Sequence, residues 1–214
     1  VVYTYSQAMR APAEGGTFAI FAYTPDSGGS DPADWIASID SVTREFDAIT
    51  YLTDNDITID GLTVYVTFPA STDYYRDYRF SINYTSVGGE TGYRLVHIYQ
   101  YSASYCYLDQ SKVTMTSNTD FSVNLYSNIN YYPQRITANI CPIMSQTVSG
   151  VTGYKLNSSF TPTSVTYTDT TVDGKHLYGL TFTLPISSEE RDCLVQVREW
   201  NEDHTSYTSL GDLI

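Results

Sequence analysis

The sequence lacks several features that would tie it to particular partners. Lys and Arg number only 11 against 24 Asp and Glu, and the formal net charge is −13. A chain this acidic repels phosphate backbones and anionic lipid surfaces, so we expect no nucleic-acid partner. No run approaches the ~20 apolar residues that a membrane-spanning helix needs, so we also expect no transmembrane segment.

Catalytic and metal-binding motifs are missing as well. The three His are scattered without ligand-type neighbours, and there is no HExxH, CxxC or GxSxG pattern. Acidic groups at 54–56 and at Asp26, Asp31 and Asp34 lack the spacing of an EF-hand, and we interpret them as solvated turns. The sequence therefore predicts a protein that is not an enzyme, with no catalytic residues, no metal and no cofactor.

Cysteine is scarce, and its number is odd. Cys106, Cys141 and Cys193 leave at least one thiol outside any bridge, which excludes a disulfide framework. One bridge between Cys106 and Cys141 is an alternative. Unbridged cysteine commonly behaves as a small apolar residue, so we expect three buried thiols.

The residues that are abundant favour β-strands. There are 21 Tyr, together with many Thr, Val and Ile. The segment 62–68 alternates and places four apolar residues on one face: Leu62, Val64, Val66 and Phe68. The segment 76–84 alternates in the same way, with three residues directed inward: Tyr78, Phe80 and Ile82. A turn at Gly88-Gly89 then predicts a return strand at 93–100.

The remaining chain shows the same short strands separated by turns. We predict further strands at 17–23, 46–52, 121–126, 135–140, 164–168, 180–184 and 193–197. The segment 30–39 is interpreted as extended, although Ser-Asp-Pro could also cap a short helix there. The polar segment 145–161 is interpreted as a long loop.

An internal echo links the two halves. VYVTFPAS at 64–71 matches LTFTLPIS at 180–187, and an Arg-Asp pair follows each copy, at 76–77 and 191–192. This pattern indicates a tandem duplication. A chain of 214 residues accommodates two sandwiches of about 100 residues each. We therefore predict an all-β fold of two tandem immunoglobulin-like β-sandwiches, at 1–102 and 103–214.

Several short motifs in the first half are similar to a known family. They are Ala13-Glu14-Gly15-Gly16 before a strand, Trp35-Ile36 in mid-domain, Arg76 at the start of a strand, and a strand that ends in Gln100. In this respect residues 1–101 resemble the BACON domain, an immunoglobulin-like module of surface and secreted proteins of gut bacteria and of their phages. The chain departs from the family pattern at Pro69, where an Asn is common. The second half lacks most of these motifs and would be a divergent related sandwich.

The resemblance implies a function in binding or in spacing. BACON domains were proposed to bind carbohydrate, and many members would be spacers only. On this basis we expect a non-enzymatic, secreted or cell-surface module that recognises glycan or mucin-type glycoprotein. The alternative is a structural protein that makes protein contacts, such as a spacer, a fimbrial subunit or a virion component. We expect an extracellular location, or a virion, with a targeting segment absent from this chain.

Aromatic residues in loops are the best candidates for ligand contact. Sugars present flat C–H faces on which tyrosine rings stack while the hydroxyl forms a hydrogen bond. Tyr74 and Tyr75 precede Arg76, and Tyr131 and Tyr132 precede a proline in another turn. These five residues form the predicted ligand-binding set. They would alternatively pack over the ends of the sandwiches. The tyrosines between 99 and 107 are expected to seal the interface between the two modules, and Trp35 is expected in the core.

Overall fold

The chain folds almost entirely into β-strands. This is seen in a computed structural model that describes residues 10–24, 31–102, 106–110, 120–127, 133–157, 161–164, 166–172, 175–183, 192–203 and 205–213. The predicted all-β class is therefore confirmed. Within those ranges, no helix is long and apolar enough to cross a membrane.

The first half forms two facing sheets. Its elements are β1 (Arg10–Ala11), β2 (Gly16–Phe21), the 3-10 helix η1 (Pro32–Asp34), β3 (Ile36–Phe46), α1 (Asp47–Tyr51), the 3-10 helix η2 (Asp54–Asp56), β4 (Ile57–Asp60), β5 (Thr63–Phe68), β6 (Tyr75–Ser86) and β7 (Thr91–Tyr101). One sheet has the order β2-β5-β4, and the other has the order β1-β7-β6-β3. Only β1 runs parallel to its neighbour among these pairs.

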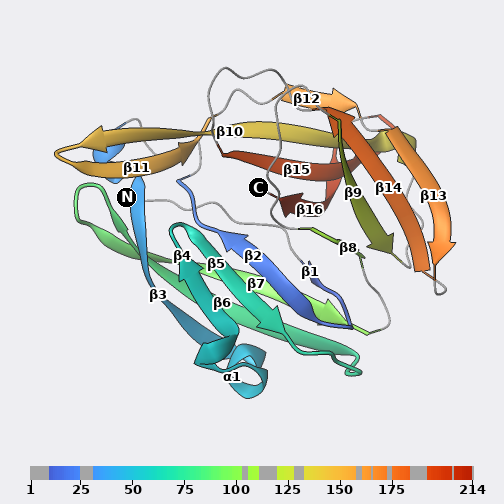
Figure 1. The fold of residues 1–214 in the computed structure, drawn as a ribbon, viewed down its shortest axis with the longest axis horizontal. Helices are drawn as coiled ribbons and strands as arrows, with labels where there is room; N and C mark the ends of the chain where they lie inside the picture. Colours follow the sequence, from blue (N-terminus) through green and yellow to red (C-terminus); the bar gives the residue numbers. More distant parts are fainter. Residues whose placement is uncertain are drawn as a thin grey trace.

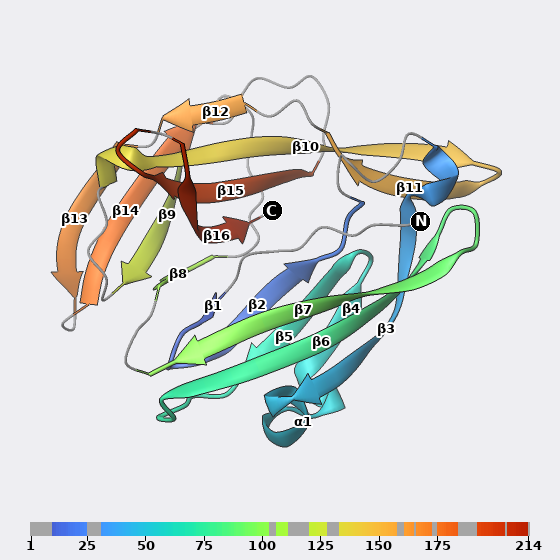
Figure 2. The same cartoon turned by 180° about the vertical axis from the view of Figure 1, so that it is seen from behind.

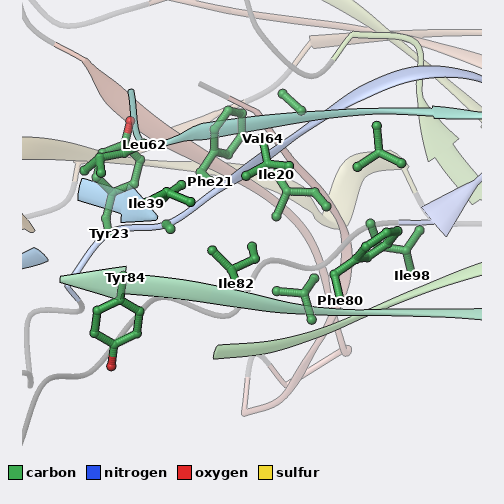
Figure 3. Close-up of a cluster of buried hydrophobic side chains, with 14 of the residues drawn as sticks. Ile20, Phe21, Tyr23, Ile39, Leu62, Val64, Phe80, Ile82, Tyr84 and Ile98 are labelled. Carbon is green, nitrogen blue, oxygen red and sulfur yellow. The ribbon is translucent and has the colours of Figure 1, made fainter. Parts of the chain in front are cut away.

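Alternating side chains from the two sheets build the first core. On β5 and the residue before it, the predicted face is buried: Leu62, Val64, Val66 and Phe68. On β6 the predicted inward residues are buried as well: Tyr78, Phe80 and Ile82. Figure 3 shows Leu62 and Val64 of the first set facing Phe80 and Ile82 of the second across the space between the sheets. The period-two pattern of the sequence thus determined which faces pack together.

The second half also has two sheets. Its elements are β8 (Cys106–Leu108), β9 (Asp120–Ser127), the 3-10 helix η3 (Pro133–Arg135), β10 (Ile136–Val148), β11 (Val151–Leu156), β12 (Thr161–Ser164), β13 (Thr166–Val172), β14 (Lys175–Thr183), β15 (Cys193–Trp200) and β16 (Tyr207–Leu213). One sheet has the order β13-β14-β9-β8. In the other, β10 lies beside β15, and β15 beside β16. A second hydrophobic cluster lies between them, with Leu125 and Leu180 from one sheet and Ile140 and Val197 from the other.

A hairpin from the second half extends a sheet of the first. The start of β10 pairs with β15, whereas its end, from Ile143 onward, pairs with β11. β11 in turn pairs with β3, where Tyr154 lies opposite Ile36. Figures 1 and 2 show the hairpin reaching across to the start of β3. A continuous sheet therefore runs through both halves.

Side chains also cross this junction. Four residues of the second half pack into the first core: Cys141, Ile143, Leu156 and Leu194. The backbone amide of Leu156 donates to the carbonyl of Thr24 over 2.8 Å, and the Thr24 hydroxyl accepts from the amide of Ile36, also over 2.8 Å. Trp35 is buried beside the junction, as expected for a core residue. The domain boundary at residue 102 stays a prediction.

Two predicted segments are different in the structure. The predicted strand at 46–52 is instead the short helix α1, which Asp47 begins. The guanidinium of Arg44 donates to the carbonyl of Ala48 within this helix and to that of Leu52 just after it, which stabilises the turn. The predicted loop at 145–161 is largely the β10–β11 hairpin. Its turn, Ser149-Gly150, has positive φ at both residues, which is the geometry that joins two antiparallel strands most tightly.

The segment 31–39 combines both alternatives. The Asp31 carboxylate accepts from the amide of Ala33 over 3.0 Å and caps the 3-10 turn η1, and β3 then begins at Ile36. Segment 25–30 lies outside the described residues.

The cysteines are thiols, and the alternative bridge between Cys106 and Cys141 is absent. Cys106 and Cys141 are buried as expected, whereas Cys193 is partly exposed at the start of β15.

Candidate functional site

The loop before β6 presents its tyrosines to solvent. It is anchored at Ser71, whose amide donates to the carbonyl of Ala13 over 2.8 Å and whose hydroxyl accepts from the amide of Asp73 over 3.1 Å. Beyond this anchor, 76% of Tyr74 and 43% of Tyr75 are exposed. Both side chains therefore lie outside the core, Tyr74 in the loop and Tyr75 at the first position of β6, and their contact with a ligand stays a prediction.

Tyr75 belongs to a tyrosine cluster on the outer face of the sheet. Its ring stacks on Tyr99 at a centroid distance of 5.8 Å and lies 5.5 Å from the ring of Tyr101. Tyr75 and Tyr101 are directly opposite in the β6–β7 ladder, and alternation places Tyr99 on the same face. We call Tyr75, Tyr99 and Tyr101 the tyrosine cluster.

The structure corrects the expected role of Tyr99, Tyr101 and Tyr107, whereas Tyr105 lies outside the described residues. Tyr99 and Tyr101 lie against Tyr75 of their own half, and Tyr107 stacks on Tyr126 of β9. The junction is built by the β10–β11 hairpin and β3 instead. The sequence contained a usable signal, because pairing β6 with β7 across a tight turn puts Tyr75 and Tyr101 opposite each other.

Arg76 is engaged in contacts within the protein. Its guanidinium lies 3.5 Å from the centroid of the Tyr51 ring, its Nε donates to Asp73 over 2.8 Å, and its Nη1 donates to the hydroxyl of Tyr78 over 3.3 Å. Its side chain is largely buried. These contacts position the loop, and the predicted ligand contact of Arg76 stays a prediction.

The hydrogen bond from Arg76 also changes the acidity of Asp73. It lowers the pKa of the Asp73 carboxyl below its usual value, and a bond from the Tyr51 hydroxyl over 3.3 Å acts in the same direction. Asp73 is therefore an ionised acceptor at neutral pH, beside the exposed ring of Tyr74.

A polar row continues the outer face beyond the tyrosine cluster. Arg79 donates through its Nε to Asp77 over 2.8 Å, and the Nδ1 of His97 lies 3.5 Å from the other Asp77 oxygen. The Asp77 amide donates to the Asp47 carboxylate over 2.6 Å. The guanidinium of Arg79 covers the ring of Phe46 at 3.5 Å. The face thus offers hydrogen-bonding groups next to aromatic rings.

The other predicted features are only partly visible. Tyr131 and Tyr132 lie outside the described residues, as does Asp26. The acidic turn at 54–56 is η2, in which Asp56 accepts from the amide of Thr53 over 2.7 Å. In the part of the chain that the structure describes, no three His, Cys, Asp or Glu side chains gather as metal ligands.

Comparison with known proteins adds no relative. No protein-family model matches the chain, and no curated protein matches it.

Proposed function

We propose that this protein is a non-enzymatic, extracellular or cell-surface binding module that recognises carbohydrate or mucin-type glycoprotein. The observation that carries the proposal is the exposure of Tyr74 and of Tyr75, which belongs to the tyrosine cluster. Burying rings in a core stabilises the fold, whereas exposed rings in contact with one another offer surface for a ligand. Polar groups alongside, such as Asp73 and His97, complement the hydroxyls of a sugar.

The strand order supports two immunoglobulin-like sandwiches as the scaffold. In a constant-type immunoglobulin domain one sheet has the order ABED and the other CFG. β8-β9-β14-β13 and β10-β15-β16 follow that order in the second half. β2-β5-β4 and β3-β6-β7 follow it in the first half, with β1 placed on the β7 edge. β5 and β14 take equivalent places, and they carry the two copies of the sequence echo, which favours a duplication.

This scaffold is consistent with the BACON resemblance of residues 1–101, which implies the same class of ligand. Fold alone does not determine function, so the tyrosines carry the proposal and the resemblance only adds to it.

A glycan-array screen with mucin-type glycans tests the proposal. We expect saturable binding by the protein and its loss in Tyr74→Ala/Tyr75→Ala. The matched control is Tyr93→Ala, which removes a ring that is 69% exposed near the opposite end of β7. Binding that is lost equally in the control, or that survives in the double variant, would contradict a site at these tyrosines.

The alternative is a structural protein such as a spacer, a fimbrial subunit or a virion component. It is favoured by the tip of the β10–β11 hairpin, which exposes Met144, Val148 and Val151. Such apolar groups suit a protein contact. Two results together would establish this alternative. The protein would bind no glycan on the array, and light scattering would detect ordered oligomers that Val148→Lys/Val151→Lys disrupts.

A further inference from the structure

Exposed apolar side chains also gather on and beside α1. Phe46 is 57% exposed, Ile49 61% and Tyr51 40%. α1 lies at the end of β3, next to the start of β6 (Figure 2). The Tyr51 hydroxyl donates to Asp73, the residue before Tyr74. This patch therefore continues the surface that carries Tyr74 and Tyr75.

Phe46 has a backbone conformation that favours glycine. Its φ is 52° and its ψ is −129°, although it carries a large side chain. Such conformations persist in residues other than glycine only when their surroundings hold them, and they cluster at binding sites. Here the ring of Phe46 is fixed by the guanidinium of Arg79, which Asp77 holds at 2.7 Å. These contacts hold the aromatic ring at the surface and keep the backbone of Phe46 in its strained conformation.

Tyr51 is held in the same manner. The guanidinium of Arg76 covers its ring at 3.5 Å, and Asp73 holds Arg76 at 2.8 Å. Two aromatic rings are thus each covered on one side by an arginine that a carboxylate fixes, while much of each ring stays exposed. Rings held rigidly lose little conformational freedom when a ligand binds.

We propose that Phe46 and Tyr51 form a second aromatic contact for the ligand of Tyr74 and Tyr75, so that the site takes an extended oligosaccharide chain. The inference rests on the proposed function. A stable protein interface takes about 20–30 residues on each side, and this patch is much smaller. Rings beside the exposed Asp73 carboxylate match a chain of sugars, whose flat C–H faces lie next to hydroxyls.

Phe46→Gly is the informative variant. Glycine adopts positive φ without cost, so the thermal midpoint should not fall when the ring is removed. The probes are a mucin-type monosaccharide, its disaccharide and a longer extension, titrated by calorimetry. We expect affinity to rise with chain length in the wild type. In Phe46→Gly the longest glycan should bind roughly two- to tenfold more weakly, the range for one aromatic contact, and the monosaccharide should be unaffected.

The outcomes separate the two proposals. Wild-type binding that Phe46→Gly leaves unchanged at every length overturns the second contact and leaves the proposed function standing. A wild type that binds none of the probes overturns both. Tyr93→Ala serves again as the control and should keep the wild-type dependence on chain length. Tyr51→Ala should lower the affinity for the longest glycan by the same factor as Phe46→Gly. An unchanged affinity would exclude Tyr51 from the site.

Discussion

Arg76 links the loop of Tyr74 to the core through one side chain. Because its hydrogen bond lowers the pKa of Asp73, we expect an Asp73 pKa below 3.8 in an NMR titration of the carboxyl carbons. Ionised Asp73 therefore stabilises the fold at pH values above the pKa that its carboxyl has in the unfolded chain. This contribution is lost as the pH falls through the lower pKa of the folded protein. Arg76→Met should return the pKa towards 3.8, and an Asp73 pKa unmoved by this substitution would refute the assignment.

Other residues that carry the BACON resemblance have structural roles. The side-chain amide of the buried Gln100 donates to the carbonyls of Pro12 and Pro69, each over 2.8 Å, and its oxygen accepts from the Tyr78 hydroxyl over 2.8 Å. At Gly15, where φ is 75°, a Cβ would lie 2.3 Å from the carbonyl oxygen of Phe68. Both residues lie at the same end of the first half, where they hold neighbouring segments together. Similarity to the BACON domain at these two positions is therefore evidence about the fold rather than about the ligand.

Among the elements, β11 approaches the first half closely at Gly153. A Cβ on Gly153 would lie 2.5 Å from Cγ2 of Val87 and 2.8 Å from Cβ of Trp35. Gly153→Ala should therefore overpack the junction and lower the free energy of unfolding by about 1–3 kcal/mol in urea titrations. The control is Val151→Thr, an exposed β-branched residue of the same strand, with an expected change of about 0.5 kcal/mol or less. Equal stability of wild type and Gly153→Ala would show that the junction relaxes freely.

The predictable elements were those with a strict period of two. Segments 62–68 and 78–84 carry an apolar residue at every second position, so the faces of β5 and β6 followed from the sequence. α1 has five residues, too few for a helical period to appear against the strand signal of Ile49 and Tyr51. The hairpin was missed because its strands are polar, although Ser149-Gly150 between two valines is a usable turn signal.

The same limit applies to the candidate site. Tyr74 could be found because a loop residue has no need of an aromatic ring, and Tyr75 was found as its neighbour although it is the first residue of β6. Phe46 and Tyr51 could not, because their role depends on contacts with Arg79 and Arg76 that only the tertiary structure supplies.

For the molecule as a whole, the hairpin makes the two cores depend on each other. Leu156 of β11 and Leu194 of β15 pack into the first core, whereas their neighbours in the second half, such as Val195 and Val197 of β15, pack into the second core. Opening the junction would expose apolar surface in the first core, so the halves should resist moving apart. We therefore expect the surface around Tyr74 to keep its orientation relative to the second half.

Tyr23, buried where the halves meet, offers a test of this coupling in alkaline solution. Burial raises the pKa of its phenol above the ordinary 10.0, and the negative charge of Asp192, from the second half, adds to the effect. The unfolded chain therefore releases this proton more readily than the folded protein, so stability should fall as the pH rises above about 10. One such group contributes a slope of about 1.4 kcal/mol per pH unit.

Urea titrations between about pH 9 and pH 11 measure this slope. Tyr23→Phe should reduce it without abolishing it, because the pKa values of the buried phenols of Tyr78 and Tyr84 are also raised by burial. Ile59→Val, altered at an exposed residue that does not titrate, is the control and should keep the wild-type slope. If Tyr23→Phe and wild type lose stability in parallel, then Tyr23 ionises without opening the junction, and the two halves are less tightly coupled than the continuous sheet implies.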